Sequence, residues 1–99
     1  QYDALVLPTS QVPPFPIEQQ YVAEINGQPL ASYLDWMRSC SWITTTCCPV
    51  IALPAGFTPE GLPVGLQIVG RPRGELALLR LAQAYEGATE LWRRRPKLD

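Results

Sequence analysis

The residues that could carry out catalysis are few in this chain of 99 residues. There is no histidine, so neither a Ser-His-Asp nor a Cys-His catalytic group can form within it. The single lysine, Lys97, follows three arginines, where we expect a solvated side chain and not a desolvated base. None of the four serines lies in a G-x-S-x-G turn or a glycine-rich loop that would supply oxyanion-binding amides: Ser10, Ser32, Ser39 and Ser41. The chain by itself is therefore predicted to be inactive.

The three cysteines do not predict a disulfide framework or a metal site. Cys40, Cys47 and Cys48 are odd in number, and two of them are adjacent. A zinc site would need ligands from elsewhere, because the chain has neither histidine nor a C-x-x-C motif. We therefore expect buried, unreactive thiols in a reducing environment, and hence a cytoplasmic protein.

Charge and hydropathy argue against nucleic acid and membranes as partners. The net charge is −1 and the pI is about 5.3, so no basic surface for nucleic acid is predicted. No apolar stretch approaches the roughly 20 residues of a membrane span. One basic cluster is interpreted as a solvated tail after a helix: Arg93, Arg94, Arg95 and Lys97.

The first half of the chain predicts a strand, a long loop and a helix. Residues 3–7 include a short apolar run typical of strands covered on both faces, as in a parallel or mixed sheet. Five prolines in residues 8–29 predict an irregular excursion. Over residues 30–43 apolar side chains recur at helical spacing, and Ser32 with Asp35 matches a helix-capping pattern.

The second half predicts an antiparallel hairpin followed by a helix. Two apolar runs, residues 49–54 and 64–70, flank a segment rich in glycine and proline. Gly65 lies in the second run, where a missing side chain predicts the close approach of another group. From Glu75 an apolar stripe predicts a helix that Pro96 cannot continue. The predicted fold class is α/β, with a partial mixed sheet of about three strands and two helices.

Three motifs together carry a resemblance to a known family. They are DALVLPT at residues 3–9, PVIALPAGF at residues 49–57 and GLPVGLQIVG at residues 61–70, followed by a Leu/Ala-rich helix. In this order they strongly resemble the C-terminal part of the amidase signature family. Residues 1–99 are accordingly interpreted as the C-terminal segment of an amidase signature domain, incomplete without the part upstream. The start at Gln1, almost directly before an apolar strand, agrees with this expectation.

The resemblance implies an α/β/α enzyme several times this length that hydrolyses carboxylic amides. In that family a serine nucleophile forms an acyl-enzyme, a lysine acts as base through a bridging cis-serine, and no metal or organic cofactor takes part. These catalytic residues would lie upstream, and none maps onto this chain. The expected partners are the upstream remainder of the enzyme and a small-molecule amide substrate.

The segment before the hairpin borders the substrate cleft in the family, and this makes four residues candidates for substrate binding: Asp35, Trp36, Cys40 and Trp42. Each also has a structural interpretation, with Asp35 as a helix cap, Trp36 and Cys40 as core, and Trp42 as cover for a helix end. Cys47 is a departure, since the family usually has glycine there. A side chain at this position would alter the turn or narrow the adjacent pocket.

Three short strands and two helices leave apolar surface uncovered, so the isolated chain is predicted to expose strand edges and to self-associate. Two alternatives are open. The chain could be an autonomous, non-catalytic interaction module that binds a partner through this surface. Within the family, the parent could instead be the A subunit of a glutamyl-tRNA(Gln) amidotransferase, which releases ammonia from glutamine for a partner subunit.

Overall fold

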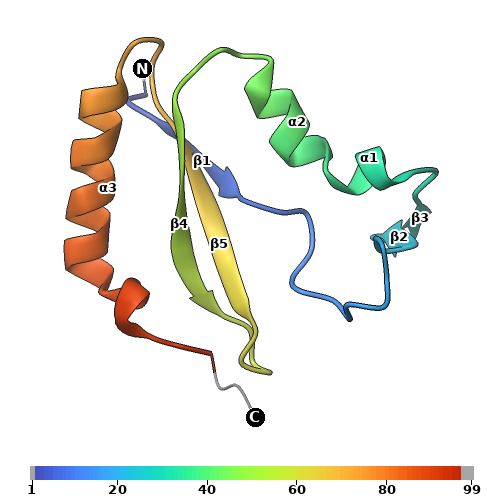
Figure 1. Cartoon of the computed structure of the whole chain (residues 1–99). Coiled ribbons are helices and arrows are strands. Elements are labelled where there is room, and N and C mark those ends of the chain that lie inside the picture. Colours follow the sequence, from blue (N-terminus) through green and yellow to red (C-terminus); the bar gives the residue numbers. More distant parts are fainter. Residues whose placement is uncertain (1, 97–99) are drawn as a thin grey trace.

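The computed structural model describes residues 2–96 and builds them around an antiparallel sheet of strand order β1-β5-β4 (Figure 1). Among the described residues the elements in chain order are β1 (Leu5–Pro8), β2 (Glu24–Ile25), β3 (Gln28–Pro29), α1 (Tyr33–Trp36), α2 (Arg38–Thr44), β4 (Val50–Phe57), β5 (Pro63–Val69), α3 (Glu75–Thr89) and the 3₁₀-helix η1 (Leu91–Arg93). The predicted α/β class, with three strands in the main sheet, is confirmed. Lys97, predicted to lie in a solvated tail, falls outside the described residues.

The hairpin of β4 and β5 forms as the glycine and proline pattern predicts. Its turn is closed by two bonds, from the Thr58 N–H to the Leu62 carbonyl at 2.8 Å and from the Gly61 N–H to the Thr58 carbonyl at 2.9 Å. Strand β4 is longer than predicted, because it continues past Pro54 through a register shift between Pro54 and Gly56. Gly56 has φ +142°, a conformation that glycine adopts readily.

Helix α3 packs against one face of β4 and β5 and forms the core there (Figure 1). Leu53 and Ile68 of the strands meet Leu78 and Ala82 of the helix, and all four are buried. The phenol of Tyr85 donates a 2.9 Å hydrogen bond to the Pro54 carbonyl. Burying each such leucine contributes about 1.5–3 kcal/mol. This contact fixes the hairpin, and it leaves the opposite face of the sheet free for the first half of the chain.

The helix predicted over residues 30–43 is divided in two at Met37. Its start is as expected, since Asp35 Oδ2 accepts the Ser32 N–H at 3.0 Å. The division has a tertiary cause, because the side-chain amide of Gln11 donates to the carbonyls of both Asp35 and Trp36. Those carbonyls then serve as the end of α1, and α2 begins with the Ser41 N–H bonded to the Met37 carbonyl.

The proline-rich segment is less irregular than predicted. It contains the two-residue strands β2 and β3, which pair antiparallel around Asn26 and Gly27. Both turn residues have positive φ, +51° and +75°, as a tight hairpin turn requires. The Asn-Gly pair in the sequence is a recognised signal for this turn.

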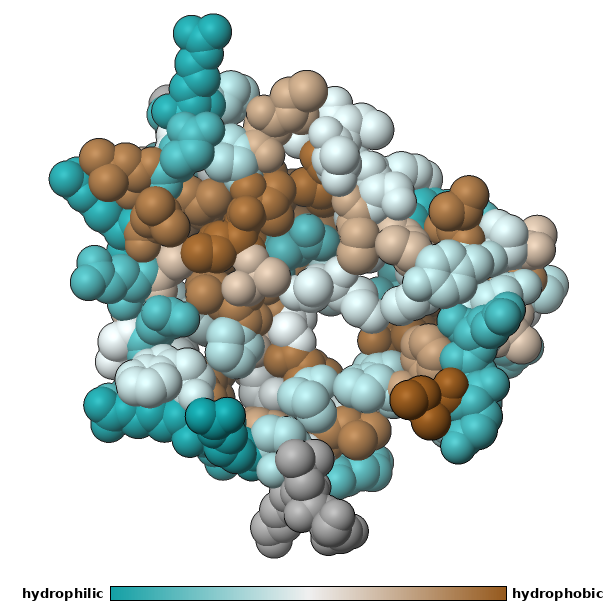
Figure 2. Space-filling model, viewed as in Figure 1, coloured by the Kyte–Doolittle hydropathy of each residue, from teal (hydrophilic) through white to brown (hydrophobic). Residues whose placement is uncertain are grey.

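The chain is open for its size. Its radius of gyration is 15.2 Å, whereas about 13 Å is usual for 100 residues. Its accessible surface is 7809 Å², against roughly 5,600 Å² expected for a folded monomer of this mass. Figure 2 shows apolar side chains on the surface and an opening that the chain does not fill. The expected uncovered apolar surface is therefore present, and it includes Leu5 and Val6 of β1, both more than half exposed.

Candidate functional site

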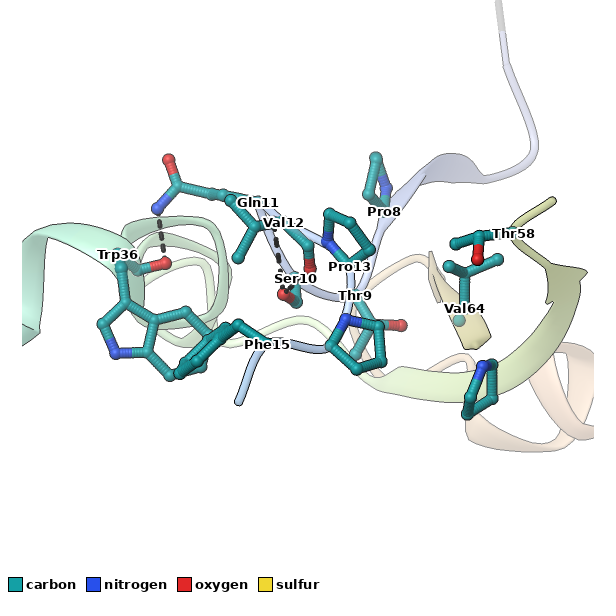
Figure 3. A pocket seen from close by; sticks show the side chains of 13 residues that line it. Pro8, Thr9, Ser10, Gln11, Val12, Pro13, Phe15, Trp36, Thr58 and Val64 are labelled. Carbon is teal, nitrogen blue, oxygen red and sulfur yellow. Dashed lines mark hydrogen bonds between the residues drawn. The ribbon is translucent and has the colours of Figure 1, made fainter. Parts of the chain in front are cut away.

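A groove of about 530 Å³ lies where the chain leaves β1 and passes the start of β5 (Figure 3). Figure 3 shows Phe15 beside Trp36 at one end of the groove, and Thr58 with Val64 at the other. The lining residues are 8–15, Trp36, Thr58 and 63–65. Three separate parts of the sequence therefore meet in this groove: the proline-rich segment, the end of α1 and the hairpin.

The end of β1 is fixed over β5 by contacts that need a glycine. The Thr9 N–H donates to the Gly65 carbonyl at 3.2 Å. A Cβ on Gly65 would lie 2.9 Å from Thr9 Oγ1, closer than real Cβ contacts allow, so the predicted close approach at Gly65 is confirmed. Buried Gln67 adds a 3.0 Å bond from its side-chain amide to the Pro8 carbonyl. These contacts hold the start of the groove in place.

The far end of the groove is an aromatic wall. The ring of Trp36 meets Phe15 at 5.5 Å between centroids and Tyr33 at 5.7 Å, both nearly perpendicular. Tyr33 in turn meets Tyr21 at 6.2 Å. Gln11 holds the Trp36 carbonyl, as Figure 3 shows. Edge-to-face aromatic contacts of this kind are favourable and directional, so the wall has a defined shape.

Asp35 is engaged as a helix cap. Its Oδ2 accepts the backbone N–H groups of Ala31 and Ser32 at 3.1 and 3.0 Å, and its Oδ1 accepts a 2.6 Å bond from Arg38. The hydrogen bond from the Arg38 guanidinium, together with these N–H groups, holds the pKa of the Asp35 carboxyl below its usual range. Asp35 does not line the groove among the described residues.

Cys40 and Trp42 lie outside the groove lining. The Cys40 thiol donates to the Thr9 carbonyl at 3.1 Å, so it supports the groove from behind. Trp42 is 65% exposed, and the Arg38 guanidinium lies 5.6 Å from the centre of its ring. Of the four predicted binding residues, Trp36 is the one that the described groove includes. Substrate-binding roles for all four stay predictions.

Sequence reasoning missed most of the groove. Phe15, Thr9 and Val64 were not singled out, although each lines it. The available signal was the position of the proline-rich segment, which begins at Pro8 directly after an apolar strand. The partner of that segment, the end of α1, was not predictable from spacing.

The described side chains of the groove cannot transfer protons at neutral pH. None of the described lining residues is ionisable. The Ser10 hydroxyl is used locally, donating to the Val12 carbonyl at 2.7 Å. The Thr9 hydroxyl and the Trp36 indole N–H are buried without a partner among the described residues. Such groups normally find a partner, here in water, in other polypeptide or in a ligand.

Comparison with known proteins places these features in a family context. A family model described as Amidase matches residues 1–79. The A subunits of two glutamyl-tRNA(Gln) amidotransferases are similar to the chain, that of Moorella thermoacetica at 44% identity and that of Chloroflexus aurantiacus at 45%, each over 98 residues and 99% of this chain. The chain spans about 19% of the length of these relatives. No solved structure was found to match it. Within the part that the structure describes, no helix is long and apolar enough to cross a membrane.

Proposed function

This chain belongs to the amidase family, and we propose that it forms one wall of the substrate cleft in a longer enzyme that hydrolyses carboxylic amides. The observation that carries the proposal is the groove, because every lining residue falls within residues 1–79, the part that the family model matches. In this enzyme the chain is the C-terminal segment. Trp36 contacts the substrate, while Asp35, Cys40 and Trp42 border the cleft.

Two further observations support a longer parent. The chain spans about a fifth of the relatives that it matches. It also exposes far more surface than a complete domain of its mass. The rest of the enzyme would then cover the apolar surface of β1 and of the outer face of α3, where Leu76 and Leu79 are exposed.

The chemistry would be divided between the two parts. A serine nucleophile, a bridging serine and a lysine base from the rest of the enzyme form and hydrolyse an acyl-enzyme. The groove would position the substrate, because holding it against a rigid wall places the amide carbon within reach of the nucleophile. It also keeps water from one side of the reacting group.

A second candidate is favoured by the similar proteins themselves. The relatives described above are the A subunits of glutamyl-tRNA(Gln) amidotransferases. A parent of that kind would release ammonia from glutamine and pass it to a partner protein. The two candidates differ in substrate, since glutamine carries an ammonium and a carboxylate beside its amide.

The test is to express the complete reading frame that contains this sequence and to measure ammonia release from a panel of amides. The expected result is hydrolysis by the complete protein, with an acyl-enzyme adduct detected by mass spectrometry and no turnover by residues 1–99 alone. The panel contains acetamide, benzamide and glutamine. No release from any of them, with the protein folded by circular dichroism, would contradict the proposal.

A further inference from the structure

We infer that the groove receives the uncharged aromatic end of an amide substrate and disfavours amides that carry a carboxylate. The inference rests on the proposed function, and it deepens that function by naming the substrate class. The part of the molecule concerned is the groove between Phe15 and Trp36 at one end and Val64 at the other.

None of the described side chains that line the groove is charged. Its described side chains are prolines, aromatic and aliphatic groups, small hydroxyls, one glutamine and one glycine. A carboxylate placed against such a wall loses its water and gains no ion pair. Gln11 is the longest polar side chain of the lining, and its amide N–H group is already donated to the carbonyls of Asp35 and Trp36.

The charged pair beside Trp36 in the sequence is already satisfied. Arg38 donates to Asp35 Oδ1 at 2.6 Å and lies over the ring of Trp42. Asp35 Oδ2 accepts the N–H groups of Ala31 and Ser32. An arriving carboxylate would share Arg38 with Asp35, whose negative charge already balances that of Arg38, and an arriving ammonium would compete for the Asp35 oxygens that cap α1.

The shape of the wall suits a flat ring. Phe15 and Trp36 meet nearly perpendicular, so the edge of one ring lies against the face of the other at this end of the groove. Aromatic groups pack well in such a corner, and proline rings at positions 8, 13, 14 and 63 add further apolar surface. The volume of about 530 Å³ is in the range of small-molecule sites.

The test compares matched substrates in the complete enzyme that carries this chain. Benzamide and 4-carboxybenzamide differ by one carboxylate, and glutamine is the charged aliphatic amide. We expect kcat/KM for benzamide to exceed that for the other two by about tenfold or more. Trp36→Ala is expected to lower kcat/KM for benzamide by about tenfold, mainly through KM, and to lower kcat/KM for acetamide by a smaller factor, because acetamide has no ring to place against the wall.

Three variants keep the result interpretable. Trp36→Phe retains an aromatic wall and should recover most of the benzamide activity. The matched tryptophan control is Trp92→Ala, because Trp92 is exposed in η1 and does not line the groove. Val64→Lys places a cation in the lining and should raise kcat/KM for 4-carboxybenzamide. If the enzyme hydrolyses amides but prefers glutamine or 4-carboxybenzamide, this inference is wrong and the proposed function survives. If it hydrolyses none of the panel, both fail.

Discussion

Cys47 occupies a backbone position that suits glycine. Its φ is +54°, in the left-handed region, where a side chain costs roughly 1–2 kcal/mol. The family resemblance marked this position as one where glycine is usual, and the backbone gives the physical reason. The residue is exposed and does not line the groove described above, so its effect falls on the turn before β4.

Replacing Cys47 by glycine is therefore expected to stabilise the chain. The gain from removing backbone strain exceeds the entropy that glycine loses on folding, and leaves a net of about 0.5–1 kcal/mol. The measurement is the urea midpoint at one fixed protein concentration. Thr45→Gly is the matched control, because Thr45 has φ −69° and should lose stability on the same change. Destabilisation by both substitutions would contradict this account of Cys47.

Asp35 gives the chain a pH dependence whose sign follows from its environment. Because hydrogen bonds from Arg38 and the backbone lower its folded pKa, the unfolded chain binds the proton more readily. The stabilisation is complete above about pH 4, the ordinary value for aspartate, and is lost as pH falls through the lower folded pKa. The stability difference between the native chain and Asp35→Asn should shrink as pH falls over that range. A constant difference from pH 6 to pH 2 would be inconsistent with the cap.

At the scale of elements, the sequence predicted the helices and strands that depend on nearby residues, and it missed features that depend on residues far away in the chain. Proline, glycine and alternating apolar residues were sufficient for the β4–β5 hairpin and for α3. They were not sufficient for the break at Met37, because it depends on the Gln11 side chain, 24 residues before Asp35. The groove has the same limitation. The role of Trp36 was proposed from the resemblance, whereas the position of Phe15 beside it depends on the path of the proline-rich segment, which spacing does not predict.

The close packing of the end of β1 against β5 predicts that Gly65 does not tolerate a side chain. Gly65→Ala should destabilise the chain by about 1–3 kcal/mol, since the new methyl group would overlap Thr9 Oγ1 and crowd the Leu53 carbonyl. Gly87→Ala, in α3 with nothing within 4 Å, should instead stabilise it by about 0.5–1 kcal/mol. Chemical denaturation of the native chain and of the two variants measures both changes in the free energy of unfolding.

A double variant separates the contact from a general intolerance of the strand. Adding Thr9→Ala to Gly65→Ala removes the Oγ1 overlap and should restore part of the lost stability, whereas Thr9→Val should not. Equal losses in both double variants would show that Thr9 is not the group that Gly65 accommodates.

At the scale of the whole molecule, much apolar surface of the described residues is left uncovered. Among the described residues only one sheet face is covered by a well-packed helix, and five hydrophobic residues are buried: Leu53, Ile68, Val69, Leu78 and Ala82. Large apolar side chains remain exposed on β1 and α3. The family resemblance, and not the composition, predicted that the chain is incomplete.

The most direct measurement is analytical ultracentrifugation of the purified 99-residue chain, with thermal melts at several concentrations. The account predicts oligomers, or a melting temperature that rises with protein concentration, because the uncovered apolar surface must find a partner. A monomer with a sharp melt that does not depend on concentration would contradict it. That result would favour an autonomous module over a wall of a larger amidase.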